Sequence, residues 1–318
     1  MDILKDSFVL DGCVFAEGDF NGCSKDIATT GLDAFFLTIP HSSKGFSEAV
    51  QSIGRIYQLC DAKPEELRVV RTVNEMAEAA RNCTISIILA FQDPYPIGNS
   101  IDRLRVFYEL GVRVIQLTYN KAGYIGTGCA ETADRGLTDF GRRVIDEMNR
   151  LGILVDLSHC STETALDALK HSSKPVVFSH SAARRISDSP RNRTDEELKL
   201  LTENGGVIGI SPWGPLCWKR MKKEQPTLDD YIDHVDYVVN LIGIDHVGFG
   251  SDNTVDYSED REGTLEQSLL YPTIVAEYDR YIGTEPDQRH AIGFRSIREI
   301  GNVVEKLRER GYTSEDIK

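Results

Sequence analysis

Eight short apolar runs recur along this chain, and most of them are separated by segments with helical periodicity. The runs cover residues 8–14, 34–39, 85–91, 112–118, 153–157, 176–178, 206–210 and 247–250. The helical segments cover residues 46–59, 101–110, 140–151, 162–171, 195–201 and 228–241. Alternation of eight strands with helices is what a (β/α)8 barrel requires, and near-continuous apolar strands fit a parallel sheet covered by helices. The sequence therefore predicts an α/β protein with a (β/α)8 TIM barrel.

The whole chain, residues 1–318, is predicted to form a single domain of this kind, with extra C-terminal helices between residues 265 and 311. A doubly wound open sheet is the alternative fold. The chain has no GxGxxG motif after its first strand and no GxxxxGK[ST] motif, so nucleotide-binding versions of the open sheet lose support.

Charge and composition exclude several classes of partner. Asp and Glu number 50 against 36 Lys and Arg, and the formal charge of −14 argues against nucleic acid or an anionic membrane surface as a partner. The N-terminal residues MDILKDSFVLDG show no basic segment followed by a long apolar one, and no run approaches the roughly 18 apolar residues that a membrane span needs. Seven cysteines without CxxC spacing fit reduced thiols. We therefore expect a cytoplasmic protein that does not bind membranes.

Two strand-like runs in the middle of the chain each lead into a Ser-His pair, ILVDLSH ending at His159 and KPVVFSHS containing His180. The ends of neighbouring parallel strands open on the same face of a barrel, so the two imidazoles are expected to approach each other. Two facing imidazoles suggest a metal. The alternative for each histidine is a packed, hydrogen-bonded side chain.

An aspartate completes a chemically sensible metal site. Asp252 follows the eighth run in the segment GIDHVGFGSD, where Gly250 lets the chain turn toward the barrel mouth. Imidazoles bind zinc through nitrogen, and a carboxylate can ligate the metal or take a proton from water, so this set predicts hydrolysis of an amide, ester or related bond. Asp252 could instead cap the next helix. The other predicted strand ends carry Cys13, Phe15, His41, Gln92, Asp93, Tyr119, Asn120 and the segment 211–213.

Several long motifs in a fixed order point to a known family. They are GLTDFGRRVIDEMNRLGILVDLSH from Gly136, KPVVFSHS from Lys174, SPRNRTDEEL from Ser189, NGGVIGI from Asn204 and DHVGFGSD from Asp245. With these motifs the chain resembles the membrane (renal) dipeptidase family, a branch of the metal-dependent amidohydrolase superfamily of TIM barrels. The likeness covers most of the chain.

The resemblance implies roles for individual residues. The family has a dinuclear zinc site, in which His159 and His180 would hold the second metal. Asp252 would lie at the first metal and act as general base. Arg191 would bind a substrate carboxylate, which suits a guanidinium group because it can pair with a carboxylate in a two-pronged way. Without the family, Arg191 is equally well read as a surface residue. A homodimer is a further expectation of the family.

Three expected motifs are altered. Where the family's first strand ends in DGHxD, this chain reads DGCVF and places Cys13 and Phe15 at the ligand positions. Gln92 stands where the family has a bridging glutamate, and Tyr119 stands where it has the histidine of an LTH motif. Losing two negative charges leaves a pair of divalent ions under-compensated, so we predict one zinc ion rather than two, held by His159 and His180.

Some groups near the altered site stay unassigned. Cys13 can supply a thiolate ligand or be a buried apolar thiol. Asp93, Glu17 and Asp19 are carboxylates without an assigned place, and Gln92 is a further candidate ligand. The chain ends in GYTSEDIK, where family members usually continue into a GGN-containing segment.

The leading hypothesis is a metal-dependent hydrolase that cleaves an amide or peptide bond in a small substrate bearing a carboxylate. A second hypothesis is a catalytically silent barrel that binds a small molecule or a partner, suggested by Phe15, Gln92 and Tyr119. A third keeps the metal and changes the reaction, with Tyr119 polarising a carbonyl or donating a proton in a lyase or a non-peptide amidohydrolase.

Overall fold

A computed structural model of the protein describes residues 3–15, 30–39, 44–254 and 261–318. All eight predicted runs form parallel strands, which confirms the (β/α)8 barrel. The barrel strands are β1 (Leu10–Phe15), β2 (Ala34–Thr38), β4 (Ile85–Phe91), β5 (Val112–Gln116), β6 (Leu154–Asp156), β7 (Val177–Ser181), β8 (Val207–Ile210) and β9 (Val247–Phe249).

Two short strands were not predicted. β10 (Asn253–Thr254) follows β9 and pairs in parallel with the end of β1, matching Val14 with Asn253, so this pairing joins the last barrel strand to the first. β3 (Leu67–Val69) pairs with the beginning of β4 and lies off the barrel path. Strands of two and three residues are too short to show a periodic pattern in the sequence.

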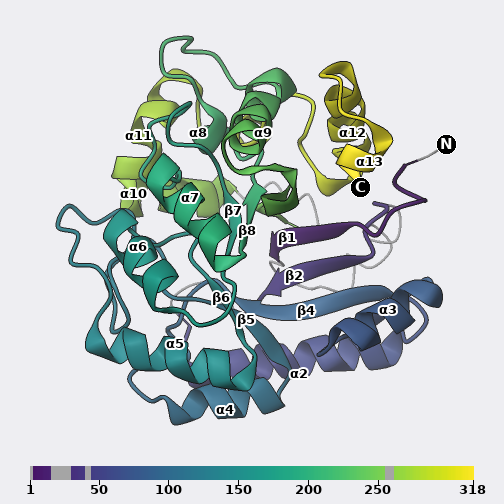
Figure 1. The fold of residues 1–318 in the computed structure, drawn as a ribbon, viewed down its shortest axis with the longest axis vertical. Coiled ribbons are helices and arrows are strands. Elements are labelled where there is room, and N and C mark those ends of the chain that lie inside the picture. Colours follow the sequence, from purple (N-terminus) through teal and green to yellow (C-terminus); the bar gives the residue numbers. More distant parts are fainter. Residues whose placement is uncertain (1–2, 16–29, 40–43, 255–260) are drawn as a thin grey trace.

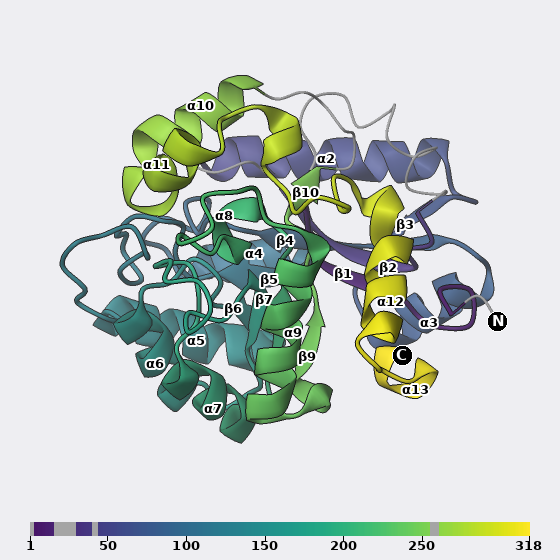
Figure 2. The same ribbon diagram turned by 90° about the horizontal axis from the view of Figure 1, so that it is seen from above.

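Helices cover the outside of the barrel, as Figures 1 and 2 show. Those that follow the first seven barrel strands are α2 (Phe46–Ala62), α3 (Val73–Arg81), α4 (Asp102–Glu109), α5 (Asp139–Leu151), α6 (Thr162–His171), α7 (Asp195–Asn204), α8 (Gly214–Cys217) and α9 (Leu228–Ile242). A short 3-10 helix, η1 (Ile244–His246), leads into β9.

The sequence determines the ends and the buried face of these helices, and α5 is a clear example. The Thr138 side chain accepts a hydrogen bond from the Gly141 amide at its N-terminus, and Gly152 ends it with a left-handed φ of 83°. Val144, Ile145 and Met148 lie on one face of the helix and are fully buried against the barrel.

The predicted C-terminal helices are present and separate into two groups. α10 (Arg261–Leu270) and α11 (Pro272–Tyr281) lie on the side of α8, whereas α12 (Ile300–Glu309) and α13 (Ser314–Ile317) lie beside α9 and the N-terminal segment (Figures 1 and 2). The short 3-10 helices η2 (Pro286–Gln288) and η3 (Ile297–Glu299) connect the two groups. None of the helices in the described part of the chain combines the length and apolarity needed to cross a membrane.

The position of β7 matters for the site. We expected His180 to follow its strand, but β7 extends to Ser181, so His180 is part of the strand. Gly209 of β8 and Gly250 after β9 both approach the carbonyl oxygen of Ser179 so closely that a Cβ atom at either position would overlap it. These glycines allow the neighbouring strands to pack tightly around the segment that carries His180.

Candidate metal and active site

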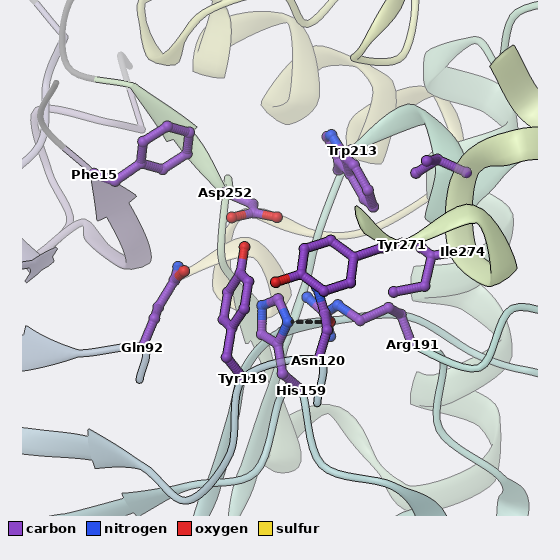
Figure 3. A pocket seen from close by; sticks show the side chains of 11 residues that line it. Phe15, Gln92, Tyr119, Asn120, His159, Arg191, Trp213, Asp252, Tyr271 and Ile274 are labelled. Carbon is purple, nitrogen blue, oxygen red and sulfur yellow. Dashed lines mark hydrogen bonds between the residues drawn. The ribbon is translucent and has the colours of Figure 1, made fainter. Parts of the chain in front are cut away.

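A cavity at the C-terminal end of the barrel strands brings together most of the predicted site residues (Figure 3). Its lining comes from the ends of β1, β4, β5, β6, β8 and β9, from the loop between β7 and α7, and from the chain before and within α11. The lining residues are Phe15, Gln92, Tyr119, Asn120, His159, Arg191, Trp213, Asp252, Tyr271, Ile274 and Val275. The cavity combines charged, aromatic and apolar groups, as a small-molecule site requires.

His159 and His180 approach each other as the sequence predicted. Their Nε2 atoms lie 3.0 Å apart, and both side chains are buried. The Nδ1 atom of His159 lies 2.7 Å from Oδ1 of Asn120, and that of His180 lies 2.7 Å from Oγ of Ser179. The hydrogen bonds of these partners decide which ring nitrogens carry protons.

Both Nδ1 atoms are assigned a proton by this network. Oδ1 of Asn120 is an acceptor, so His159 donates to it from Nδ1. The Ser179 hydroxyl donates its own proton to Asp156 over 2.5 Å, so its oxygen accepts from Nδ1 of His180. The two Nε2 atoms therefore face each other with lone pairs. A cation bound to both Nε2 atoms would remove the repulsion between these lone pairs. A hydrogen bond donated by Nδ1 is the usual support of a metal-bound histidine.

The pKa values of both imidazoles lie well below the ordinary histidine range. Burial is the main cause, and the positive charge of Arg191 is the second. Both rings therefore stay neutral at pH 7, which is the state that binds a metal. The donor set fits the divalent ion that the resemblance implies.

Asp252 lies next to His180, with Oδ1 3.9 Å from its Nε2 atom. Burial raises the pKa of this carboxyl. Its backbone has a left-handed φ of 55°, an uncommon conformation for a residue other than glycine, and its amide donates to the Cys13 carbonyl over 3.0 Å. The residues that follow form β10, so the described chain places Asp252 at the barrel mouth and not at a helix cap.

The β1 side of the site contains the altered residues. Cys13 is buried, and its Sγ atom lies 3.7 Å from Oδ1 of Asp252 and 2.7 Å from Nε2 of Gln92. Ligand atoms of Cys13, His180 and Asp252 all lie within 4.8 Å of one another, the one such group of three among the described residues. Phe15 places an apolar ring at the edge of the same cavity.

Arg191 is buried, which excludes the alternative of a surface residue. Its Nη1 atom donates to the carbonyl oxygen of Ser158, and its Nη2 atom donates to that of His180 over 3.3 Å. The guanidinium group therefore braces the two chain segments that carry the imidazoles, and it also lines the cavity.

Tyr119 stacks on the ring of His159, with ring centroids 4.4 Å apart and an interplanar angle of 23°. Its hydroxyl points into the cavity toward Asp252 in Figure 3. Burial raises the pKa of this phenol, so it stays protonated. The position agrees with the predicted contact with substrate, which stays a prediction.

One of the remaining candidate carboxylates, Asp93, is not part of the described group of ligand atoms. Oδ1 of Asp93 accepts a hydrogen bond from the Tyr95 amide over 2.9 Å, in the turn after β4. Glu17, Asp19 and His41 lie outside the described residues.

Sequence reasoning did not assign four groups that shape the site. Asn120 and Ser179 orient the imidazoles, and only their side-chain geometry reveals this role. Tyr271, whose ring meets Tyr119 edge-on at a centroid distance of 5.8 Å, comes from the C-terminal helices, which carried no site signal. His290 is buried beside the backbone of Asp252, which partly offsets the lowering of the His290 pKa by burial.

The family profile and the related sequences that match this chain point to the same family. The profile of "Membrane dipeptidase (Peptidase family M19)" matches residues 29–289. The dipeptidase verJ of Clonostachys rogersoniana is 33% identical over 82% of this chain and 67% of its own length. The dipeptidase tcpJ of Claviceps purpurea is 32% identical over 84% of this chain and 65% of its own length. The chain thus spans about two thirds of the length of these relatives.

Solved structures agree in fold. An amidohydrolase from Pseudomonas aeruginosa superimposes with a TM-score of 0.86 at 30% identity, covering 99% of this chain and 93% of the other. A metallo peptidase from Rhodobacter sphaeroides, bound to a phosphinate mimic of the dipeptide L-Ala-D-Ala, gives a TM-score of 0.78 at 20% identity over 98% of this chain and 95% of the other. The second likeness shows the fold alone.

Proposed function

Since the chain belongs to the membrane dipeptidase family (peptidase family M19) and is thus a hydrolase of a metallopeptidase family, we propose that it cleaves the amide bond of a small dipeptide-like substrate with a free carboxylate, using one zinc ion. The observation that carries this proposal is the pair of buried imidazoles whose Nε2 atoms face each other over 3.0 Å. His159, His180 and Asp252 are the residues that we assign to the ion.

When bound, the ion would polarise the scissile carbonyl and lower the pKa of a water molecule. Asp252 is assigned to take the proton of the attacking water, because its carboxylate lines the cavity beside His180. Its Oδ1 atom faces His180, so Oδ2 is the oxygen that we assign to the proton.

Arg191 is assigned to the substrate carboxylate. A guanidinium group has five N–H donors, and two of its nitrogens each donate one hydrogen bond to a main-chain carbonyl. Further N–H bonds on the same group can pair with a carboxylate in the cavity. Tyr119, protonated and stacked on His159, is assigned to donate a hydrogen bond to the substrate.

The apolar ring of Phe15 favours one alternative, a barrel that binds a dipeptide-like ligand without hydrolysing it. Phe15 and Gln92 occupy positions at which the family resemblance implied two acidic ligands. The two functions differ in whether zinc-loaded protein turns substrate over.

The test uses protein purified without chelator. Elemental analysis is expected to find about one zinc ion per chain, and the protein is expected to hydrolyse an unblocked dipeptide such as Ala-Ala but not its C-terminal amide. A zinc-loaded protein that binds Ala-Ala without turnover supports the binding function. A protein without zinc, inactive after zinc is added, contradicts the metal assignment.

A further inference from the structure

We propose that Cys13 is a thiolate ligand of the zinc ion assigned above to His159, His180 and Asp252, so that sulfur, nitrogen and oxygen donors share the ion. This inference rests on the proposed zinc-dependent function and names the ligands of that site. Its first support is proximity: among the described residues, ligand atoms of Cys13, His180 and Asp252 all lie within 4.8 Å of one another.

The backbone fixes Cys13 relative to Asp252. The Cys13 carbonyl accepts a hydrogen bond from the Asp252 amide over 3.0 Å and one from the Ser251 hydroxyl over 3.2 Å. Oδ1 of Asp11 accepts from the amides of Cys13 and Ser251 over 3.0 and 2.8 Å. These hydrogen bonds join the end of β1 to the chain that follows β9. Such rigid support is what two metal ligands need to stay at a fixed separation.

Gln92 suits a thiolate at this position. Its Nε2 atom donates to Sγ of Cys13 over 2.7 Å, and an N–H donor stabilises the negative form of sulfur. Burial and the charge of Asp252 raise the pKa of this thiol well above its usual range, so a bound cation is needed to form the thiolate. The bridging glutamate implied by the resemblance would instead place a second negative charge against the thiolate. The change to glutamine and the change to Cys13 are thus complementary, and both are explained by one sulfur-containing site.

The charges of the ligand set balance for one ion. A thiolate and a carboxylate carry two negative charges, the imidazoles are neutral, and a divalent zinc ion carries two positive charges. Binding replaces the S–H proton of Cys13 by zinc and releases that proton to solvent. Balanced charge matters here because Cys13 and His180 are buried, where an uncompensated ion is costly.

The ligand types also predict metal preference. Thiolate and imidazole donors favour zinc and cadmium, whereas magnesium and manganese favour sites built from oxygen atoms. His159, with its Nε2 atom 3.0 Å from that of His180, is a further nitrogen donor beside this set.

The experiment is X-ray absorption spectroscopy of the zinc-loaded full chain, with Cys13→Ser as the test variant and Cys83→Ser as the control. Cys83 is an exposed thiol outside the site. We expect a sulfur scatterer at about 2.3 Å from zinc in the wild type and in the control, and its loss in Cys13→Ser. The zinc dissociation constant of Cys13→Ser should rise by more than about 100-fold, because loss of an outer partner alone costs 10–100-fold.

Two outcomes separate this inference from the proposed function. Zinc bound to the wild type with only nitrogen and oxygen neighbours overturns the role of Cys13 and leaves a metal-dependent hydrolase intact. A wild type that binds no zinc overturns both. If Cys13→Ser does not fold, Cys13→His replaces it: the inference expects zinc to stay bound without a sulfur neighbour, and a sulfur signal that persists in this variant contradicts the inference.

Discussion

On one side of the barrel mouth, β6 and β7 hold two imidazoles in a closed network of hydrogen bonds, whereas on the other side β1 and β4 present a thiol, an amide and an apolar ring. The imidazole side is built around Asp156, which accepts from the hydroxyls of Ser158 and Ser179. The thiol side has Gln92 as its donor. The ligands on the two sides have different hydrogen-bond partners, so a ligand on one side can change without removing the support of the other.

Removing an imidazole tests the imidazole side, formed by β6 and β7, and should have the largest effect on zinc affinity. His180→Ala deletes a fully buried ligand, so we expect zinc affinity and kcat/KM each to fall by more than about 100-fold. The matched control is His171→Ala, whose imidazole is paired with Asp146 on the surface. Zinc affinity that is equal in the two variants would mean that the β6 and β7 side does not bind the ion.

Removing a support of the imidazole should have a smaller effect. Ser179→Ala takes away the acceptor for Nδ1 of His180, and we expect zinc affinity to fall about 10–100-fold. It also leaves Asp156 short of one donor, so the free energy of unfolding should fall by about 1–3 kcal/mol. Calorimetric zinc titration and denaturant unfolding measure the two effects. A loss of stability with unchanged zinc affinity would make Ser179 purely structural.

The role of Arg191 can be separated from its buried contacts by choice of substrate. Arg191→Lys keeps the charge but loses the planar fork, so we expect kcat/KM for an unblocked dipeptide to fall about tenfold, mainly through KM. The buried contacts with the carbonyls of Ser158 and His180 should also lower the melting temperature. Unchanged kinetics with a lower melting temperature would show that Arg191 only braces the imidazole segments.

A third histidine makes the imidazole side sensitive to acid. Nδ1 of His234 accepts from the Ala183 amide over 3.1 Å, and burial lowers the pKa of His234 from 6.5 to about 3. The unfolded chain therefore takes up a proton below pH 6.5 that the folded chain refuses, so this contribution to stability is present above pH 6.5 and is lost as pH falls toward 3.

The variant His234→Gln keeps an acceptor for the Ala183 amide and removes this titration. Between pH 7.5 and 5, the wild type should lose about 2 kcal/mol more unfolding free energy than His234→Gln. Denaturant unfolding at the two pH values measures the difference. Parallel losses in both proteins would place the acid sensitivity elsewhere.

The sequence predicted the barrel because its strands are continuous apolar runs that end in polar residues, and β4, buried along its whole length, shows the pattern most clearly. It also predicted that His159 and His180 approach, since neighbouring strand ends must share a face. The residues that support the imidazoles and line the cavity could not be predicted from the sequence. Asn120 and Ser179 act through rotamers, and Tyr271 reaches the cavity through the packing of helices far along the chain, which no periodic pattern encodes.

Several expectations stay predictions. They are the number of zinc ions, the substrate, a homodimer and a cytoplasmic location. Of these, metal number follows most directly from the comparison of the two sides, because a thiolate and a carboxylate balance one divalent ion and not two.

Calorimetric titration of the demetallated full chain with zinc tests this claim most directly. The account predicts one tight equivalent per chain, with release of a proton from Cys13 on binding. A second tight equivalent would contradict the account, because it would show that the β1 and β4 side, despite Cys13, Phe15 and Gln92, builds a metal site of its own.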